Sequence, residues 1–123
     1  MPSEDDFRRI ALGMKDAMEG AHMGHPDFRA HGRIFATIHP DHVYGMVKLT
    51  PDQQQEFVRA LRAAFAPENG AWGRAGCTSV RLDSVDEETL GDVMTLAWQN
   101  AARATKASKP SRARKAVRPR RTR

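Results

Sequence analysis

Apolar residues near the start of the chain recur at intervals of three and four, the spacing that gathers side chains on one face of a helix. They are Phe7, Ile10, Ala11, Met14 and Met18. Ser3 is a suitable N-cap, and Asp5 and Asp6 place negative charge at the positive end of the helix dipole. We therefore predict an amphipathic helix that runs from Ser3 to about Glu19.

Further along the chain the spacing changes to a period of two, which places alternate side chains on opposite faces of a strand. In residues 33–39 the apolar face consists of Ile34, Ala36 and Ile38, and the mixed face consists of Arg33, Phe35, Thr37 and His39. In residues 44–49 one face consists of Gly45, Val47 and Leu49, and the other of Tyr44, Met46 and Lys48. Turn residues at 40–42 predict that these two strands are antiparallel neighbours. A tight turn at 31–32 predicts a third, shorter strand at 28–30.

Thr50, Pro51 and Gln53 together mark a helix start, with a capping threonine, a proline at the first helical position and a glutamine that closes a capping box. The predicted helix ends before Pro67, and its apolar stripe consists of Phe57, Val58, Leu61 and Phe65. A glycine-rich loop follows. Residues 77–82 then predict a strand whose core face consists of Thr78, Val80 and Leu82.

A last helix is predicted from Ser84, which forms a capping box with Glu87. Its apolar stripe consists of Leu90, Val93, Met94, Ala97, Trp98 and Ala101. Beyond Arg103 the apolar periodicity is lost. We therefore predict one small α+β domain over residues 1–103, an antiparallel sheet packed with N-terminal, middle and C-terminal helices. A disordered basic tail is predicted at 104–123.

The charge of the chain is divided unevenly between these two parts. The formal net charge is +5, from 20 Lys and Arg and 15 Asp and Glu. Nine of the basic residues and none of the acidic ones lie in the tail: Lys106, Lys109, Arg112, Arg114, Lys115, Arg118, Arg120, Arg121 and Arg123. The remaining 11 basic residues against all 15 acidic ones give residues 1–103 a formal charge of −4. A basic tail on a mildly acidic body predicts weak, sequence-independent attraction to nucleic acid.

The cellular compartment is indicated by cysteine content and by the start of the chain. The single Cys77 cannot form an internal disulfide, which favours a reducing compartment. The acidic residues 3–6 are the opposite of a signal-peptide start, and no apolar run is long enough to cross a membrane. We therefore expect a cytoplasmic protein.

Three separated motifs occur in order along the chain: F-R-A-H-G-R-I-F-A-T-I-H-P, V-K-L-T-P-D-Q-Q and A-W-G-R-A-G-C-T. With the helices around them, they resemble the MmcQ/YjbR-like family over nearly all of residues 4–102. The resemblance implies a compact α/β domain with an antiparallel sheet, a fold described as CyaY-like or double-wing, and members are commonly labelled DNA-binding proteins. The family's tryptophan-glycine pattern maps onto Trp72, Gly73 and Gly76, whereas Cys77 stands where many members carry a second aromatic residue.

The reactive residue types do not form a recognised catalytic or metal-binding pattern. Two pairs spaced three apart occur among the five histidines: His22, His25, His31, His39 and His42. With one cysteine, they lack the four ligands of a usual zinc site, so turn or surface histidines are the preferred interpretation. Cys77 has no recognisable base beside it and is expected to be a buried structural thiol, while a helix start explains the carboxylates at 83–92. We therefore expect no enzyme activity, no cofactor and no metal.

The two tryptophans have different expected positions. Trp98 lies on a helical apolar stripe and is expected in the core. Trp72, in a glycine-flanked loop, either covers the core or stands exposed as a platform for stacking, and we prefer the first interpretation. Candidate phosphate contacts on the body lie on strand faces or in the glycine loop: Arg29, Arg33, Lys48, Arg74 and Arg81.

The leading hypothesis is a non-enzymatic DNA-binding protein that contacts phosphates. The tail gives most of the affinity, and Arg33, Lys48, Arg74 and Arg81 orient the body. The expected partner is DNA, bound with little base preference by a monomer or weak dimer. The alternative is a protein-interaction or small-ligand module whose concave sheet face receives a partner around Phe35, Tyr44 and Trp72. Fold analogy to frataxin-like domains extends this alternative to weak metal binding by acidic residues.

Overall fold

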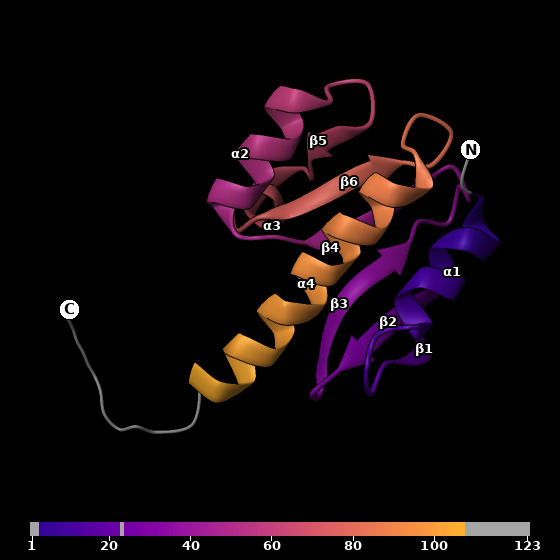
Figure 1. Cartoon of the computed structure of the whole chain (residues 1–123), viewed down its shortest axis with the longest axis vertical. Coiled ribbons are helices and arrows are strands. Elements are labelled where there is room, and N and C mark those ends of the chain that lie inside the picture. The colour runs from indigo at the N-terminus through magenta and orange to yellow at the C-terminus, as the bar shows by residue number, and fades with distance from the viewer. Residues whose placement is uncertain (1–2, 23, 108–123) are drawn as a thin grey trace.

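A long helix lies diagonally across one face of a twisted sheet and sets the layout of the fold (Figure 1). The computed structural model describes residues 3–22 and 24–107, and in these residues six strands form one antiparallel sheet in the order β1-β2-β3-β4-β6-β5. The strands are β1 (Met18–His22), β2 (His25–Ala30), β3 (Arg33–Ile38), β4 (Tyr44–Lys48), β5 (Phe65–Pro67) and β6 (Cys77–Arg81). The helices are α1 (Glu4–Leu12), α2 (Pro51–Ala60), α3 (Gly70–Arg74) and α4 (Glu87–Ala107). The predicted α+β fold with an antiparallel sheet is confirmed.

Helices α1 and α4 pack on the same face of the sheet, which we call the inner face. The largest side chains of this layer are fully buried: Phe7, Phe28, Phe35, Ile38, Val47, Val80, Leu90 and Met94. Phe7 of α1 lies directly against the backbone of Gly45 in β4, where an added Cβ would be 2.5 Å from the ring. This close approach explains the glycine at a buried strand position.

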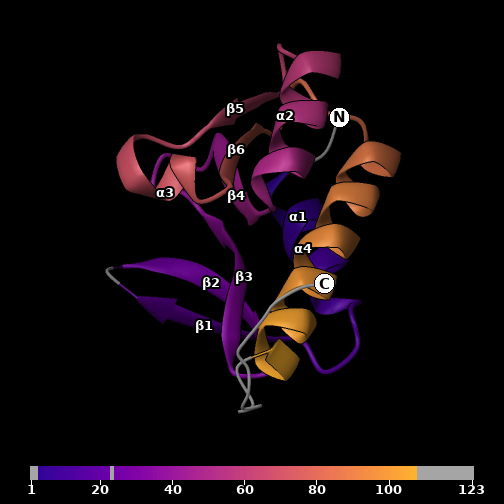
Figure 2. The same ribbon diagram turned by 90° about the vertical axis from the view of Figure 1, so that its left-hand side faces the viewer.

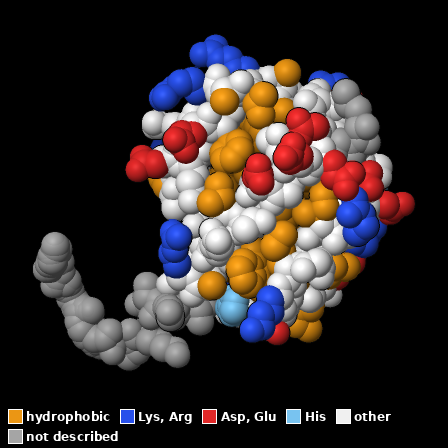
Figure 3. Space-filling view, viewed as in Figure 1, with side chains coloured by type: hydrophobic (Ala, Val, Ile, Leu, Met, Phe, Trp, Pro, Cys, Tyr) orange, Lys and Arg blue, Asp and Glu red, His pale blue; other side chains and the backbone are white. Residues whose placement is uncertain are grey.

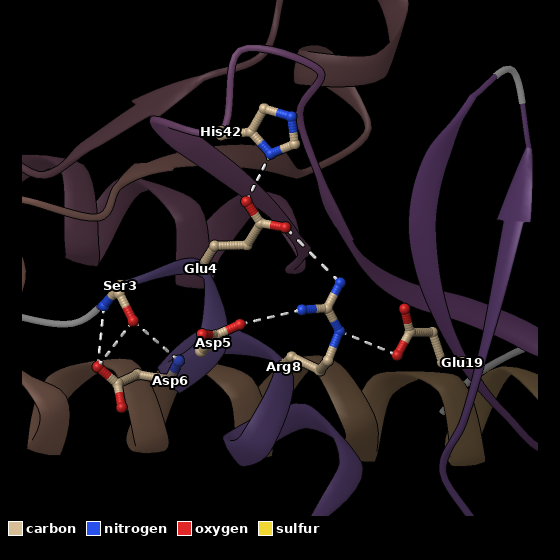
Figure 4. A network of polar contacts seen from close by, with 7 residues as sticks. All are labelled: Ser3, Glu4, Asp5, Asp6, Arg8, Glu19 and His42. Carbon is tan, nitrogen blue, oxygen red and sulfur yellow. Dashed lines mark hydrogen bonds and ion pairs between the residues drawn. The ribbon is translucent and has the colours of Figure 1, made fainter.

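A polar network fixes α1 against its neighbours (Figure 4). Arg8 Nε donates to Glu19 of β1 at 3.0 Å, and Arg8 also pairs with Asp5 at 3.3 Å. Glu4, at the start of the helix, forms a hydrogen bond with His42 in the turn between β3 and β4. The helix is therefore tied both to the edge strand β1 and to the middle of the sheet.

Helix α1 ends at Leu12, so the prediction of a helix that reaches Glu19 is wrong. Asp16 has a φ of 63°, which is left-handed backbone that cannot continue a right-handed helix. The next residues form the edge strand β1, in which Met18 is 64% exposed instead of lying on the helical apolar stripe. The residue spacing that suggested a longer helix therefore spans a helix, a turn and a strand.

A β-bulge in β3 changes the predicted alternation of that strand. Two consecutive residues of β2 pair with Ala36 and Ile34, so Phe35 between them is an additional residue. Phe35 and Ala36 both belong to the buried core, whereas Ile34 lines a pocket on the opposite face together with Thr37. The prediction that Ile34 shares a face with Ala36 is therefore wrong, and so is the placement of Phe35 on the concave face in the alternative hypothesis.

The capping box predicted at Thr50 is confirmed, because its side chain accepts from the Gln53 backbone N–H while the Gln53 side chain accepts from the Thr50 backbone N–H. The helix is shorter than predicted and ends at Ala60. Phe65, which the residue spacing predicts on the helical stripe, lies in β5 and pairs with β6. Its ring still packs 5.2 Å from the ring of Phe57, so the apolar contact is formed by a strand and not by a longer helix.

Helix α4 begins and ends later than predicted. Its cap is Asp86, whose Oδ1 accepts from the Thr89 backbone N–H at 2.7 Å, so the prediction of Ser84 as the cap is wrong. The helix continues past Arg103 to Ala107, into the first residues of the predicted tail. Among the described residues, no helix combines the length and the apolar content that a membrane span requires.

Candidate functional site

The face of the sheet opposite α4, which we call the outer face, is flanked by α3 and by the β1–β2 hairpin (Figure 2). The strand faces predicted for β4 and β6 are confirmed by their pairing and burial. Cross-strand pairs on the outer face are Tyr44 with Arg81, Met46 with Ser79, and Lys48 with Cys77. Val47, Thr78 and Val80, which alternate with these residues, are fully buried. The outer face therefore carries a mixture of polar, charged and apolar side chains.

Strands β3 and β4 separate toward one end of this face. The last residues that pair there are Ala36 and Val47. Two adjoining pockets lie there, and we call them together the groove. The outer pocket, of about 250 Å³, is lined by His25, Ile34, Thr37, His39, Met46, Lys48, Glu68, Trp72 and Cys77. The helix pocket, of about 330 Å³, is lined by Arg33, Ile34, residues 48–51, Trp72, Ala75, Cys77, Ala97, Asn100 and Ala101. The shared residues show that the two pockets meet beside Ile34, Lys48 and Trp72.

Trp72 stands at the junction of the two pockets and is 69% exposed. The short helix α3 carries it, and Gly73 allows α3 to lie against the preceding loop, where an added Cβ would be 1.8 Å from the Glu68 carbonyl oxygen. The preferred prediction that Trp72 covers the core is therefore wrong, and its exposure fits the alternative. Trp98, which is expected in the core, is half-buried and packs against the buried cluster, and its Nε1 donates to the Lys15 carbonyl at 2.8 Å.

A histidine–glutamate pair lies in the outer pocket. His39 Nε2 is 2.7 Å from Glu68 Oε2, and both side chains are half-buried. The His39 ring also meets the ring of Tyr44 edge-on, with centroids 6.5 Å apart. The Glu68 backbone N–H donates to the Cys77 carbonyl at 3.0 Å, which holds the residue after β5 beside the outer face. Because the sequence pattern predicts no strand at 65–67, nothing in the sequence indicates that these two residues meet.

Cys77 is buried, as predicted. Burial is the main cause that raises the pKa of its thiol above the ordinary value, and Glu68 raises it further, while Lys48 acts in the opposite direction. The thiolate is the nucleophilic form of cysteine. A buried thiol with a raised pKa is therefore poorly suited to nucleophilic catalysis.

The structure brings two of the predicted body cations together. Arg33, which is exposed, and Lys48, which is half-buried, both line the helix pocket. Arg74 is exposed at the end of α3 and does not line either pocket. Two of the predicted body cations therefore lie at the end of the groove next to α4.

Two other predicted cations are held by carboxylates elsewhere. Arg81 Nε donates to Asp83 at 2.7 Å, and its guanidinium lies 5.9 Å from the centroid of the Tyr44 ring. The hydrogen bond with Asp83 is the main cause that raises the pKa of Arg81. Arg29 donates to both oxygens of the fully buried Asp27, at 2.8 and 3.0 Å. These two arginines therefore support local structure outside the groove.

The predicted tail cations lie mostly beyond the described residues. Lys106 falls in the last turn of α4, and the other eight belong to residues 108–123, which the structure does not describe. Helix α4, the last described element before them, passes the groove. Asn100 and Ala101, near the end of α4, line the helix pocket.

Histidines of the described part of the chain form local contacts. His42 pairs with Glu4 of α1, and His31 and His42 occupy turns with φ values of 57° and 62°. Within residues 3–22 and 24–107, no three His, Cys, Asp or Glu side chains are grouped as metal ligands. The positions of these histidines fit the turn and surface roles expected from the sequence.

Comparisons with known proteins agree with the resemblance seen in the sequence. A search of curated proteins gives no match. The fold is similar to the crystal structure of Deinococcus radiodurans protein DR2400, family-model domain DUF419, with a TM-score of 0.71 and 21% identity over 83% of this chain and 80% of that chain. The sequence model of the family described as YjbR matches residues 12–100. Because this match spans more than half of the chain, the protein belongs to the YjbR family.

Proposed function

We propose that the protein binds nucleic acid through its phosphates, with the groove as the site on the folded domain and the basic tail as a second contact. The observation that carries this proposal is the grouping of Arg33 and Lys48 with the exposed Trp72 in one groove. Cationic side chains bind phosphate oxygens, and an exposed aromatic ring offers a face to bases. The groove combines both kinds of group.

The basic tail begins close to this groove. Ala101 lines the helix pocket, and α4 ends six residues later at Ala107. At 1.5 Å per residue, Ala107 lies about 9 Å beyond Ala101 along the helix axis. We therefore propose that a phosphate chain in the groove also contacts the eight basic residues of 108–123, which follow α4 in the sequence.

The opposite side of the molecule carries acidic side chains over three helices. Figure 3 shows Asp and Glu side chains over α1, the first part of α4 and α2, with Lys and Arg side chains beside α1 and near α2. Exposed members of α4 are Glu87, Glu88 and Asp92. Phosphates respond to the local potential and not only to the summed charge, so the net charge of −4 on residues 1–103 is compatible with binding at the groove.

No covalent step is part of the proposal. Cys77, the thiol that lines both pockets, is buried and has a raised pKa, so little thiolate forms near neutral pH. Binding alone accounts for the residues in the groove. We therefore propose a binding protein that acts without a cofactor.

The test is a salt titration of the binding of the full chain to a DNA duplex of mixed sequence. Affinity is expected to fall linearly with salt on logarithmic axes, with a slope of about 0.9 per neutralised phosphate. Arg33→Gln and Lys48→Gln should each reduce that slope by about 1. Arg59→Gln is the matched control, because it removes an exposed arginine of α2 that lines neither pocket, and its slope should equal that of the wild type.

A further full-length variant separates the domain from the tail. It replaces every Lys and Arg of residues 108–123 with Gln and is expected to bind more weakly but with a measurable salt slope. If this variant does not bind at all, and the two groove variants keep the wild-type slope, the tail alone binds and the proposal for the domain fails.

The outer pocket favours a second candidate, a small-ligand module. Its concave shape, its apolar side chains and the His39–Glu68 pair are features that small-molecule sites share. Such a ligand would bind with little salt dependence and equally well to the tail variant. Those two results together would favour the small-ligand candidate over nucleic acid.

A further inference from the structure

We infer that the outer pocket receives one unpaired base, so that the preferred ligand of the groove is a single-stranded nucleic acid and not a duplex. The inference rests on the proposed function, because it takes phosphate contacts at Arg33 and Lys48 as its starting point. It identifies the part of the ligand that enters the outer pocket, in addition to the phosphates that Arg33 and Lys48 contact.

The outer pocket has the walls and the size that a base requires. Trp72 forms an exposed aromatic wall, and Ile34 and Met46 add apolar lining. The volume of about 250 Å³ is slightly below the range of roughly 300–1,000 Å³ for pockets that hold drug-sized ligands. A single planar ring system therefore suits the space. Stacking on an aromatic side chain accepts any base, because every base has a π-face.

The two ends of the groove differ in the charge of the side chains that line them. Glu68 and His39 lie in the outer pocket, 2.7 Å apart, whereas Arg33 lines only the helix pocket, and Lys48 lines both. A carboxylate repels a phosphate but accepts hydrogen bonds from the N–H groups on the edge of a base. The groove therefore favours one orientation of a nucleotide, with its phosphate toward Arg33 and its base toward Glu68.

A base within a duplex cannot enter this pocket while it remains stacked and paired. It must first be flipped out, at the cost of the lost pairing and stacking, whereas a base in a single strand needs no such step. A single strand can therefore use both the phosphate contacts and the Trp72 contact. Stacking of one base on an aromatic side chain is worth roughly 5- to 150-fold in affinity.

The experiment uses the full chain with Trp98→Phe, which leaves Trp72 as the only tryptophan. The probes are a 12-nucleotide single strand of mixed sequence, its 12-base-pair duplex, and a 12-nucleotide strand in which every position is an abasic deoxyribose phosphate. Binding is followed by fluorescence of Trp72 and by competition. The single strand is expected to quench Trp72 and to bind at least about fivefold more tightly than the other two probes.

Trp72→Ala tests the pocket directly. It should lower the affinity for the single strand to that for the abasic strand, while the affinities for the duplex and the abasic strand stay unchanged. Leu61→Ala is the matched control, because it truncates an exposed apolar residue at the end of α2, and it should leave all three affinities unchanged.

The outcomes separate this inference from the proposed function. Equal affinity for all three probes with unchanged Trp72 emission would overturn the inference, but phosphate binding at the groove would stand. If none of the probes binds the full chain, both fail. A deoxynucleoside monophosphate that binds as tightly as the 12-nucleotide strand would also overturn the inference, because the ligand would then be a free nucleotide and not a strand.

Discussion

The two faces of the sheet differ in how completely their side chains are covered. On the inner face, Phe28, Phe35 and Val80 are fully buried beneath α1 and α4. On the outer face, Met46 is half-buried and Trp72 is 69% exposed. Burial of large apolar side chains is the dominant favourable contribution to folding. The comparison indicates that the inner face stabilises the domain, which leaves the outer face available for binding.

The two faces are linked through the bulge in β3. The additional residue Phe35 adds a second consecutive side chain to the core, next to Ala36, and this shift turns Ile34 toward the outer pocket, which Thr37 also lines. Without the bulge, a strict period of two would place Ile34 in the core. A single irregular residue therefore contributes to the core and to the pocket at the same time.

The largest effect on stability is expected from the inner face. Phe28→Ala removes a fully buried ring whose centroid lies 5.9 Å from that of Phe7. The free energy of unfolding should fall by about 3–5 kcal/mol, because transfer free energy is lost and a cavity remains. Urea denaturation followed by far-UV circular dichroism measures it. A loss below about 1 kcal/mol would contradict the assignment of this face as the core.

A smaller loss in the free energy of unfolding is expected at Gly73, where α3 lies directly against the backbone of the preceding loop. In Gly73→Ala the new Cβ would lie 1.8 Å from the Glu68 carbonyl oxygen, so α3 must move. Such overpacking costs about 1–3 kcal/mol, and the shift should also change the emission of Trp72. Gly91→Ala is the control, since nothing lies within 4 Å of its new Cβ. It should stabilise helix α4 by up to about 1 kcal/mol. Equal effects of the two variants would show that this contact does not fix α3.

The next effect concerns the residue that joins α4 to the groove. Asn100 Nδ2 donates to the Lys48 carbonyl at 3.1 Å and to Gln53 Oε1 at 2.8 Å. Asn100→Ala should lower the free energy of unfolding by about 1 kcal/mol, measured by the same urea titration. Gln99→Ala on the same helix is the control and should change stability by less than about 0.5 kcal/mol. A loss as small as that of the control would mean that the two hydrogen bonds of Asn100 contribute nothing to the free energy of unfolding.

Much of the fold could be predicted because local signals agreed with the final structure. The capping box at Thr50 and the turn at His31 and Gly32 are confirmed in the structure. The helix predicted at the start of the chain is too long, because Met18 continues a helical spacing that the left-handed backbone of Asp16 interrupts. Periodicity reports which side chains are spaced alike, but not whether the backbone between them stays helical.

The candidate site was only partly predictable for a related reason. Arg33, Lys48 and Trp72 were each identified, but their meeting depends on the separation of β3 from β4 and on the position of α3. The His39–Glu68 pair depends on β5, whose residues resemble a helix end in the sequence. Contacts between distant segments are set by the whole sheet, so the spacing within any one segment cannot reveal them.

A weaker effect is expected from the ionisation of Cys77. Burial raises the pKa of the folded thiol above its ordinary value of 9.0, so the unfolded chain loses this proton at a lower pH than the folded chain. The resulting stability is fully present below the ordinary value and is lost as pH rises through the folded pKa. From about pH 8 to about pH 10, the wild type should therefore lose more free energy of unfolding than Cys77→Ala. An identical loss in both proteins would contradict the raised pKa.

The smallest effect on stability is expected from Trp72→Ala. This side chain is larger than that of Phe28, yet its truncation removes little buried area because 69% of it is already exposed. The free energy of unfolding should change by no more than about 0.5 kcal/mol in the same urea titration. A loss close to that of Phe28→Ala would make Trp72 part of the core, and the outer face could then not be free to bind. With stability unchanged, any loss of nucleic-acid affinity in this variant comes from the missing ring and not from a partly unfolded domain.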